Sequence, residues 1–497
     1  MTDITMQIDQ WGITKQNQVA ITYAQSNITY GDLKVFSDLV AQKISSHKDK
    51  IPVIIVCKRS IEFIYVMLGI MKSGNCYIPI EMPYLPNRLD EILNQFESFI
   101  VIADEKYDAL KKYENNTLYI SEIIASEKVV LDKYNGLSEN DSCYIIFTSG
   151  TSGVPKGVEI LYLSLLNLVN NFLGIFFDAY ENPISVGVLS SFSFDASIKQ
   201  IFGALFYGHT LVIAKREDKL FSTRMQQFFS RHDIKIIDGT PTIYNILMKK
   251  KKRDNWNIDF ILIGGEILYW QFVQSLSEYL NNQSNIINVY GPTECCVDAA
   301  YYWTNLSYEV KEDRVPIGKP IRNAIFSLYD EKGNLITEKG VCGELYISGI
   351  LVAKGYRSNE LNNVFFDDVK RGKTYKTGDI AYRDDSENYI ILGRCDNQVK
   401  INGNRIELEE IESVLSKIVN GEVVVCMKND YSKVRLYAFV HGESYINELE
   451  CLKKAKKMLP SYGVPDRIIV TQRKFPITPN GKIDRKKILK ICIEEGC

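Results

Sequence analysis

Residues 147–157 read F-T-S-G-T-S-G-V-P-K-G and follow the apolar run C-Y-I-I. Glycine lets backbone N–H groups approach anionic oxygens, the Ser and Thr hydroxyls add donors, and Lys156 adds a mobile cation. No hydroxyl residue follows the lysine, so the segment differs from the phosphate loop of kinases and motor ATPases. A Gly/Ser/Thr-rich surface turn would read similarly in isolation, but the chemistry favours a loop that holds the phosphates of a nucleotide.

On either side of this loop, strand-like apolar runs alternate with helical patterns, which is typical of parallel α/β sheets. The clearest of these elements are strands at residues 52–56, 76–80, 234–237, 260–263 and 286–289, and a helix at 61–71. Residues 315–392 instead predict a smaller β-rich subdomain of short strands separated by turn pairs. The last part reads as a compact α+β domain, with helices at 405–419 and 452–458 and strands at 421–427 and 434–440.

The composition is that of a globular protein with two or more domains, with 497 residues, 45% hydrophobic and 24% charged. Its 59 basic and 61 acidic residues leave a net charge of −2, which gives no case for a nucleic-acid or membrane partner. No signal-peptide pattern and no apolar run of membrane length is present, so we expect a cytoplasmic protein. The 11 cysteines lack zinc spacing, and the 4 histidines lack a nucleophile motif.

Further polar or glycine-rich islands stand between the expected elements. In chain order they are I-T-Y-G-D-L at Ile28, M-K-S-G-N-C-Y-I-P-I at Met71, F-D-A-S at Phe194, N-V-Y-G-P-T-E at Asn288, G-E-L-Y-I-S-G-I-L-V-A-K-G-Y at Gly343, Y-K-T-G-D-I at Tyr375, G-R-C-D-N-Q-V-K-I-N-G-N-R-I-E-L-E-E-I-E at Gly393, L-P-S-Y-G-V-P at Leu459 and N-G-K-I-D-R at Asn480. Together with residues 147–157 they resemble the adenylate-forming superfamily, most closely the amino-acid adenylation domains of nonribosomal peptide synthetases and their free-standing relatives. Departures are small: Gly463 stands where methionine is frequent, and Glu409 where glycine is.

The resemblance implies an α/β fold in two domains. Residues 1–395 would form a large N-terminal adenylation core of two doubly wound α/β lobes plus a β-barrel-like subdomain. Residues 396–497 would form a small mobile C-terminal α+β lid domain that carries the catalytic lysine. By the same resemblance Asp396 is the hinge, about which the small domain rotates to exchange Lys482 for the loop around Gly403 between two half-reactions.

Joining a carboxylate to the α-phosphorus of ATP needs no general base, because the carboxylate is already ionised at neutral pH. It needs alignment and charge neutralisation. The resemblance assigns Lys482 to bridge the substrate carboxylate and the α-phosphate, and Glu294 to bind Mg²⁺, a hard cation that prefers carboxylate oxygen. The pyrophosphate half of ATP would be held by Thr148, Ser149, Gly150, Thr151, Ser152, Gly153 and Lys156, with Thr151 counted among the catalytic residues.

The nucleoside half of ATP would meet three residues. Tyr290 offers a planar face for adenine, Asp379 would accept both ribose hydroxyls, and Arg394 would reach the same sugar. Each also has a structural reading, as a core aromatic, a turn residue and a solvated cation respectively.

Asp195 matches the residue that pairs with the substrate ammonium in family members that activate α-amino acids. Lys199 follows one helical turn later, either as an i,i+4 partner of Asp195 on a solvated face or as a partner for a side-chain carboxylate of the substrate. The selectivity positions carried over by the motifs are Asp195, Ala196, Lys199, Asp238, Leu262, Gly264, Val289, Val297, Asp298 and Lys482. That set resembles the pattern for L-glutamate.

No G-G-x-S phosphopantetheine site and no condensation-type H-H-x-x-x-D-G motif occurs, so we expect transfer in trans to the phosphopantetheine thiol of a separate carrier protein. Free coenzyme A would serve the same chemistry. Two alternatives stay open at this point. One is a ligase for D-alanine or another small amino acid, which would leave Lys199 without a partner. The other is a non-catalytic nucleotide-binding protein of the same fold.

Overall fold

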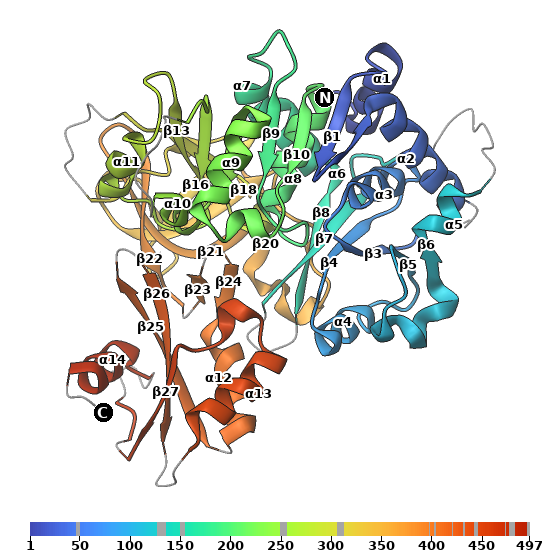
Figure 1. The fold of residues 1–497 in the computed structure, drawn as a ribbon. Helices are drawn as coiled ribbons and strands as arrows, with labels where there is room; N and C mark the ends of the chain where they lie inside the picture. Colours follow the sequence, from blue (N-terminus) through green and yellow to red (C-terminus); the bar gives the residue numbers. More distant parts are fainter. Residues whose placement is uncertain are drawn as a thin grey trace. The chain divides into compact units, whose positions relative to one another are not determined.

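The computed structural model describes residues 1–45, 50–126, 136–149, 155–248, 256–305, 313–396, 398–401, 404–419, 421–430, 433–441, 446–472, 474–476 and 483–494. The chain divides into two compact units (Figure 1). The first comprises Met1–Tyr84, Leu93–Phe147 and Gly157–Cys395, and the second Leu85–Ile92, Thr148–Lys156 and Asp396–Cys497. Among the described helices, none combines the length and the hydropathy that a bilayer span requires.

The largest sheet of the first unit has nine strands in the order β15-β14-β13-β12-β11-β9-β10-β1-β2. The strands from β13 to β1 in this order are parallel, and their apolar residues are buried because helices cover the sheet. The bounds are β1 Val19–Tyr23, β2 Ser26–Thr29, β9 Ser185–Val188, β10 Thr210–Ile213, β11 Ile234–Gly239, β12 Phe260–Ile263, β13 Asn285–Tyr290, β14 Ala300–Trp303 and β15 Lys319–Pro320.

A second sheet of the first unit has seven strands in the order β19-β8-β7-β4-β3-β5-β6. Apart from the exposed Glu62 in its first turn, every residue of the helix α3, Ile61–Lys72, is buried, which fits its largely apolar sequence. The bounds are β3 Val53–Lys58, β4 Tyr77–Met82, β5 Ile100–Ala103, β6 Thr117–Tyr119, β7 Ser142–Thr148, β8 Lys156–Leu161 and β19 Gly355–Tyr356. The predicted alternation of strands and helices in parallel sheets is confirmed.

The predicted β-rich subdomain is a third sheet of the first unit, with six strands. Its strands run in the order β17-β16-β18-β21-β20, and β22 pairs with β21. All of these pairs are antiparallel, which suits short strands joined by turns. The bounds are β16 Ala324–Tyr329, β17 Leu335–Ile336, β18 Gly343–Gly349, β20 Phe365–Asp368, β21 Gly372–Arg383 and β22 Tyr389–Arg394.

The second unit contains a hairpin, a three-stranded sheet and helices. The helix predicted from residue 405 begins instead at Leu408, because Asn404–Glu407 pairs as a strand with Gln398–Ile401. Arg485 ties the last helix to α12 through ion pairs with Glu409, at 3.0 Å, and with Glu412. The bounds are β23 Gln398–Ile401, β24 Asn404–Glu407, α12 Leu408–Val419, β25 Glu422–Asp430, β26 Lys433–His441, α13 Glu448–Met458, β27 Arg467–Thr471 and α14 Arg485–Glu494.

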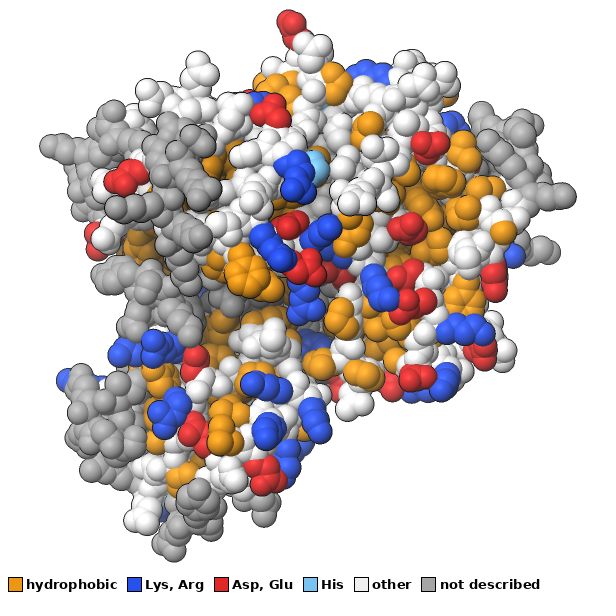
Figure 2. Space-filling model, viewed as in Figure 1, with side chains coloured by type: hydrophobic (Ala, Val, Ile, Leu, Met, Phe, Trp, Pro, Cys, Tyr) orange, Lys and Arg blue, Asp and Glu red, His pale blue; other side chains and the backbone are white. Residues whose placement is uncertain are grey.

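Positive and negative side chains are interspersed over the face drawn in Figure 2, in keeping with the net charge of −2. The remaining α-helices are α1 Ile4–Thr14, α2 Tyr30–Ser45, α4 Pro86–Leu93, α5 Ile120–Ile124, α6 Tyr162–Asn167, α7 Gly174–Phe177, α8 Ala196–Phe206, α9 Ser222–His232, α10 Pro241–Met248 and α11 Trp270–Ser277.

Candidate active site

Three residues predicted to meet the nucleoside come together in the first unit. The carboxylate of Asp379, on β21, accepts a hydrogen bond from the Tyr290 hydroxyl at 2.6 Å and one from Arg394 Nη1 at 2.7 Å. Asp379 and Tyr290 are both buried. Burial, and then the Asp379 charge, raise the pKa of Tyr290 well above its usual value, so the phenol stays a donor. The arrangement holds one carboxylate firmly between two donors.

Glu294 lies in the short 3-10 turn Thr293–Cys295 and is 1% exposed. Its Oε1 accepts a hydrogen bond from the Tyr356 hydroxyl at 2.5 Å. Within the described residues, no cluster of three or more His, Cys, Asp or Glu side chains could hold a metal ion by itself. A single buried carboxylate fits Mg²⁺ as one ligand among water and phosphate oxygens, which is the way this ion commonly binds beside nucleotides.

Six of the predicted site residues lie outside the described residues. They are Gly150, Thr151, Ser152 and Gly153 of the predicted phosphate loop, the predicted catalytic Lys482, and Gly403. Thr148, Ser149 and Lys156 are described and belong to the second unit. Lys156 Nζ lies 3.0 Å from Oε1 of Glu407, which is also in that unit. Asp396 is the first residue of the second unit's main segment, and its carboxylate accepts from the Gln398 N–H at 3.1 Å.

The predicted amino-acid pocket lies at the carboxyl edge of the nine-stranded sheet, where ligands bind in open α/β sheets. Asp238 pairs in register with Leu262 on the neighbouring strand, and Val289 lies near the end of the next one. Gly264 follows β12 and has no room for a side chain. A Cβ there would lie 2.8 Å from both the Cγ2 and the carbonyl oxygen of Val289. The floor of the pocket is therefore closely packed.

Lys199 lies in the helix α8 and is only 4% exposed, so its reading as a lysine on a solvated face is wrong. Its Nζ is 2.9 Å from Oδ1 of Asp238 and 3.0 Å from Oδ2 of Asp298. Among the described residues it contacts no third acceptor. One ammonium and two carboxylates give this buried cluster a net charge of −1 if all three are ionised.

The charges of the cluster depend on one another. Burial lowers the pKa of Lys199, but the carboxylates of Asp238 and Asp298 outweigh that effect and the net shift is upward. Burial raises the pKa of both aspartates, and the lysine opposes the shift only in part. The lysine therefore stays charged, and the aspartates take up a proton more readily than exposed ones.

Asp298 is presented to the lysine by a tight turn. The Asp298 N–H donates to the Cys296 carbonyl at 3.0 Å, and the intervening Val297 has φ of 75°. Cys296 also has a positive φ, of 54°. A β-branched residue with positive φ is strained, and such strain concentrates at functional sites. Gly291 lies against this turn, since a Cβ there would be 2.3 Å from the Val297 carbonyl oxygen.

Asp195 stands at the position just before α8, without a capping hydrogen bond from its side chain, and Ala196 is the first residue of the helix, so both lie at the end of α8 that also carries Lys199. Three further residues of the site were not predicted from the sequence. Tyr356 hydrogen-bonds Glu294, Arg59 holds the loop before Asp195, and Gln200 contacts Asp238. Gln200 had a local signal, because it adjoins Lys199 within the apolar run I-K-Q-I-F.

Comparison with known proteins identifies the family. Residues 8–357 match the family described as AMP-binding enzyme, and the chain belongs to it. Bacitracin synthase 1 of Bacillus licheniformis is 31% identical over 479 residues, which cover 94% of this chain and 9% of that protein. Surfactin synthase subunit 1 of Bacillus subtilis (strain 168) is 32% identical over 454 residues, which cover 88% of this chain and 12% of that protein. The chain thus spans only about a tenth of the length of these two relatives.

Solved structures share the fold. The adenylation domain AlmE of Vibrio cholerae, in complex with glycyl-adenosine-5'-phosphate, matches with a TM-score of 0.84 at 22% identity, covering 99% of this chain and 98% of that chain. PA1221, an NRPS protein containing adenylation and PCP domains, matches with a TM-score of 0.83 at 22% identity, covering 99% of this chain and 97% of that chain. The predicted fold class, with a large N-terminal domain and a small C-terminal one, is confirmed.

Proposed function

We propose that the protein activates an amino acid with ATP, forming an aminoacyl-AMP and releasing pyrophosphate. Membership of the AMP-binding enzyme family supports the use of ATP. The observation that carries the amino-acid substrate is the buried cluster of Lys199, Asp238 and Asp298, at the carboxyl edge of a parallel sheet and beside Asp195. A hydrocarbon substrate would have no use for these charges, whose burial is costly.

In the proposed reaction the protein aligns two anions and neutralises their charge. Asp379, fixed by Tyr290 and Arg394, would accept the ribose hydroxyls. Lys482 would lie between the substrate carboxylate and the α-phosphate. The pyrophosphate half of ATP would contact Lys156 and the loop of residues 148–153. Glu294 would hold Mg²⁺, which supplies positive charge to the phosphates when it is bound.

L-glutamate is the proposed substrate. Asp195 would pair with its ammonium, and Lys199 would face its γ-carboxylate. An ammonium has three N–H donors, and the ion pairs to Asp238 and Asp298 leave one direction for the substrate. Apolar walls from Leu262, Val289 and Val297 would bury the methylene groups, the small Ala196 would leave space, and Gly264 would let Val289 pack closely beneath them.

One observation favours a rival substrate. The sequence disfavours a small amino acid such as D-alanine on the ground that Lys199 would lack a partner, yet Lys199 has two carboxylate partners within the protein. The objection to a small or neutral side chain therefore no longer holds. The two substrates differ in the charge that they bring to the cluster, and a substrate profile separates them.

Amino-acid-dependent exchange of pyrophosphate into ATP tests the proposal. Each proteinogenic amino acid and D-alanine would be supplied in turn to the purified protein, with Asp379→Ala as the control for the nucleotide site. We expect glutamate to lead the profile and the control to show a raised KM for ATP. A profile led by D-alanine would replace glutamate, and no exchange with any amino acid would reject the activity.

The second half-reaction is proposed to transfer the aminoacyl group to the phosphopantetheine thiol of a separate carrier protein, with residues 396–497 turning about Asp396 as a mobile lid on the core of residues 1–395. The NRPS relative PA1221, which contains adenylation and PCP domains, supports this acceptor by likeness of fold alone. Thioester formation on a carrier added in trans, compared with free coenzyme A, tests the acceptor. Loading of coenzyme A but of no carrier would reject it.

A further inference from the structure

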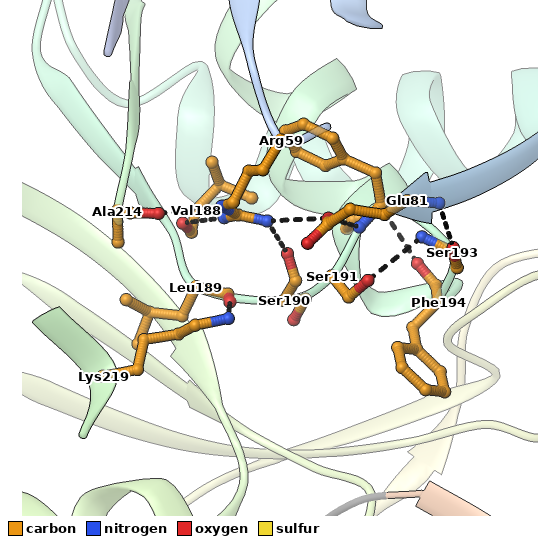
Figure 3. Close-up of polar contacts among 12 residues, drawn as sticks. Arg59, Glu81, Val188, Leu189, Ser190, Ser191, Ser193, Phe194, Ala214 and Lys219 are labelled. Atoms are coloured by element: carbon orange, nitrogen blue, oxygen red, sulfur yellow. Dashed lines mark hydrogen bonds and ion pairs between the residues drawn. The ribbon is translucent and has the colours of Figure 1, made fainter. Parts of the chain in front are cut away.

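The loop that follows β9 is held by cations from elsewhere in the first unit (Figure 3). Arg59, buried at the end of β3, donates from Nη2 to the Val188 carbonyl and from Nη1 to the Ser190 carbonyl, both at 2.7 Å. Lys219 Nζ donates to the Leu189 carbonyl between them at 2.8 Å. Three successive carbonyls are thus fixed just before the pocket residue Asp195.

Glu81, on β4, extends this support (Figure 3). Its Oε2 accepts from the Phe192 N–H at 2.7 Å and from Arg59 at 3.3 Å. Its own N–H donates to the Ser193 hydroxyl at 2.7 Å. The loop therefore joins the seven-stranded sheet, which carries Arg59 and Glu81, to the nine-stranded sheet, which carries the pocket.

Gln200 connects this loop to the charged cluster. Its Oε1 accepts from the Leu189 N–H at 3.1 Å, and its Nε2 donates to the Ser190 hydroxyl at 3.0 Å and to Asp238 Oδ2 at 2.8 Å. Only one orientation of the amide satisfies these partners, because the backbone N–H needs an acceptor and the Asp238 carboxylate needs a donor. Gln200 is 2% exposed, so water does not replace these bonds.

Asp238 has its two oxygens in different roles. Oδ2 accepts the hydrogen bond from Gln200, while Oδ1 faces Lys199 at 2.9 Å. The contact between Oδ1 and the lysine ammonium is an ion pair, which depends less on direction than the hydrogen bond from the planar Gln200 amide. The directional bond from Gln200 therefore sets the rotation of the carboxylate, and the carboxylate sets where the ammonium lies.

We propose that Gln200 is a positioning residue for amino-acid selectivity, which fixes Asp238 and through it Lys199 against the loop held by Arg59. The inference rests on the proposed amino-acid activation. Gln200 makes no contact with the reacting atoms in this proposal. It acts by holding Asp238, and through it the Lys199 ammonium that would pair with the substrate side chain.

Two variants test the proposal in pyrophosphate exchange. Gln200→Met removes both hydrogen-bonding ends at similar size. We expect kcat/KM for glutamate, relative to glutamine, to fall roughly 10- to 100-fold, since a buried hydrogen bond to a charged group is lost. The loss should appear in the KM for the amino acid, with the KM for ATP unchanged. Gln226→Met is the matched control, because within the described residues the side chain of Gln226 hydrogen-bonds only the Ser222 hydroxyl, at 3.4 Å, on the same helix α9.

Gln200→Glu keeps the shape of the side chain, but its hydrogen bonding depends on pH because the new carboxyl group can ionise. Ionised, it opposes the Asp238 carboxylate and should lower the glutamate preference as Gln200→Met does. Protonated, it again offers an acceptor to Leu189 and a donor to Asp238. Its glutamate preference should therefore recover as the pH falls, more steeply than that of the wild type, whereas Gln200→Met should not recover.

The outcomes separate this inference from the function on which it rests. A change confined to the ratio between amino acids, with the pH rescue in Gln200→Glu, supports it. An equal loss with all amino acids, or an unchanged ratio in both variants, overturns it and leaves amino-acid activation standing. A wild type that exchanges with no amino acid removes the activation and the inference together.

Discussion

At the scale of single residues, the main feature is a lysine shared between two buried carboxylates. Removing a partner from a buried ion pair leaves an uncompensated charge in a medium of low polarity, which is far more costly than the net worth of the pair. We therefore expect Lys199 to support folding as well as the proposed selectivity. A substitution that tests the second role has to preserve the first.

Lys199→Gln alone should lower the free energy of unfolding by about 3–5 kcal/mol, because Asp238 and Asp298 lose their counter-ion. The double variant Lys199→Gln/Asp298→Asn also removes one carboxylate, which returns the cluster to its original net charge of −1, so we expect a smaller loss of stability. In it we expect kcat/KM for glutamate to fall roughly 10²–10³-fold and glutamine to become preferred, since an amide can pair with the new side chain. Thermal unfolding and pyrophosphate exchange measure the two effects. A double variant that still prefers glutamate would contradict the role of Lys199.

The cluster also predicts a pH dependence. With both aspartates ionised, the net charge of −1 repels a γ-carboxylate, and protonation of one aspartate makes the cluster neutral. Because burial raises the pKa of Asp238 and Asp298, this proton is taken up as the pH falls towards their raised values. We expect kcat/KM for glutamate relative to glutamine to rise as the pH is lowered from neutral. Asp298→Asn should flatten the profile, and a flat wild-type profile would argue against the charge balance.

At the scale of elements, the pocket depends on how the ends of strands and one helix meet. Apart from the cap and its first turns, α8 is apolar, and Lys199 and Gln200 are its only buried residues that carry a charge or an amide. Strands β11 and β12 place Asp238 and Leu262 level with each other. Gly264, which follows β12, packs closely on Val289, and we expect this contact to form the floor of the proposed pocket.

Gly264→Ala should damage that floor. The added Cβ would meet the Val289 side chain and carbonyl at 2.8 Å, and backbone cannot move aside cheaply. We expect a loss of about 1–3 kcal/mol in the free energy of unfolding and a raised KM for the amino acid. The matched control is Gly421→Ala, whose Cβ would have its nearest neighbour at 3.6 Å. If Gly264→Ala behaves like this control in denaturant unfolding and in pyrophosphate exchange, Gly264 is not packed too closely on Val289 to accept a side chain.

Local pattern was enough for several elements. The strand predicted at residues 260–263 coincides with β12, because an apolar run of this length suits a strand and is too short for a typical helix. The helix predicted from residue 405 began too early, since amphipathic spacing does not show that Asn404–Glu407 pairs with β23. The contacts of Lys199 with Asp238 and Asp298 join distant positions, so only family resemblance grouped them and only the fold shows that they touch.

At the scale of the whole molecule, the residues of the proposed active site are distributed over two compact units. The first holds the pocket cluster and the Tyr290–Asp379–Arg394 group, and the second holds Lys156 and the segment that leads to Lys482. Three residues after Lys482, Arg485 is anchored to the helix α12 by Glu409 and Glu412. Arg485 thus belongs to the second unit, whereas the proposed pocket residues Lys199, Asp238 and Asp298 belong to the first.

Lys482→Ala should nearly abolish adenylate formation and largely spare transfer from supplied glutamyl-adenylate to a carrier, because the lysine is proposed to serve only the first half-reaction. Pyrophosphate exchange measures the first step, and thioester formation from synthetic adenylate measures the second. Lys487→Ala, in the same basic segment, is the control for a general loss of charge. Equal loss of both half-reactions in Lys482→Ala would refute the alternation of domains.

The turn at residues 296–298 bears on any transplantation of this pocket into another scaffold. Cys296 and Val297 both hold positive φ, and Gly291 leaves no space for a Cβ beside them. A graft that copied Asp298 alone onto an ordinary extended backbone would aim its carboxylate away from the lysine. Gly291 and residues 296–298 therefore depend on one another structurally, and a substitution of the pocket has to replace all of them together or leave all of them unchanged.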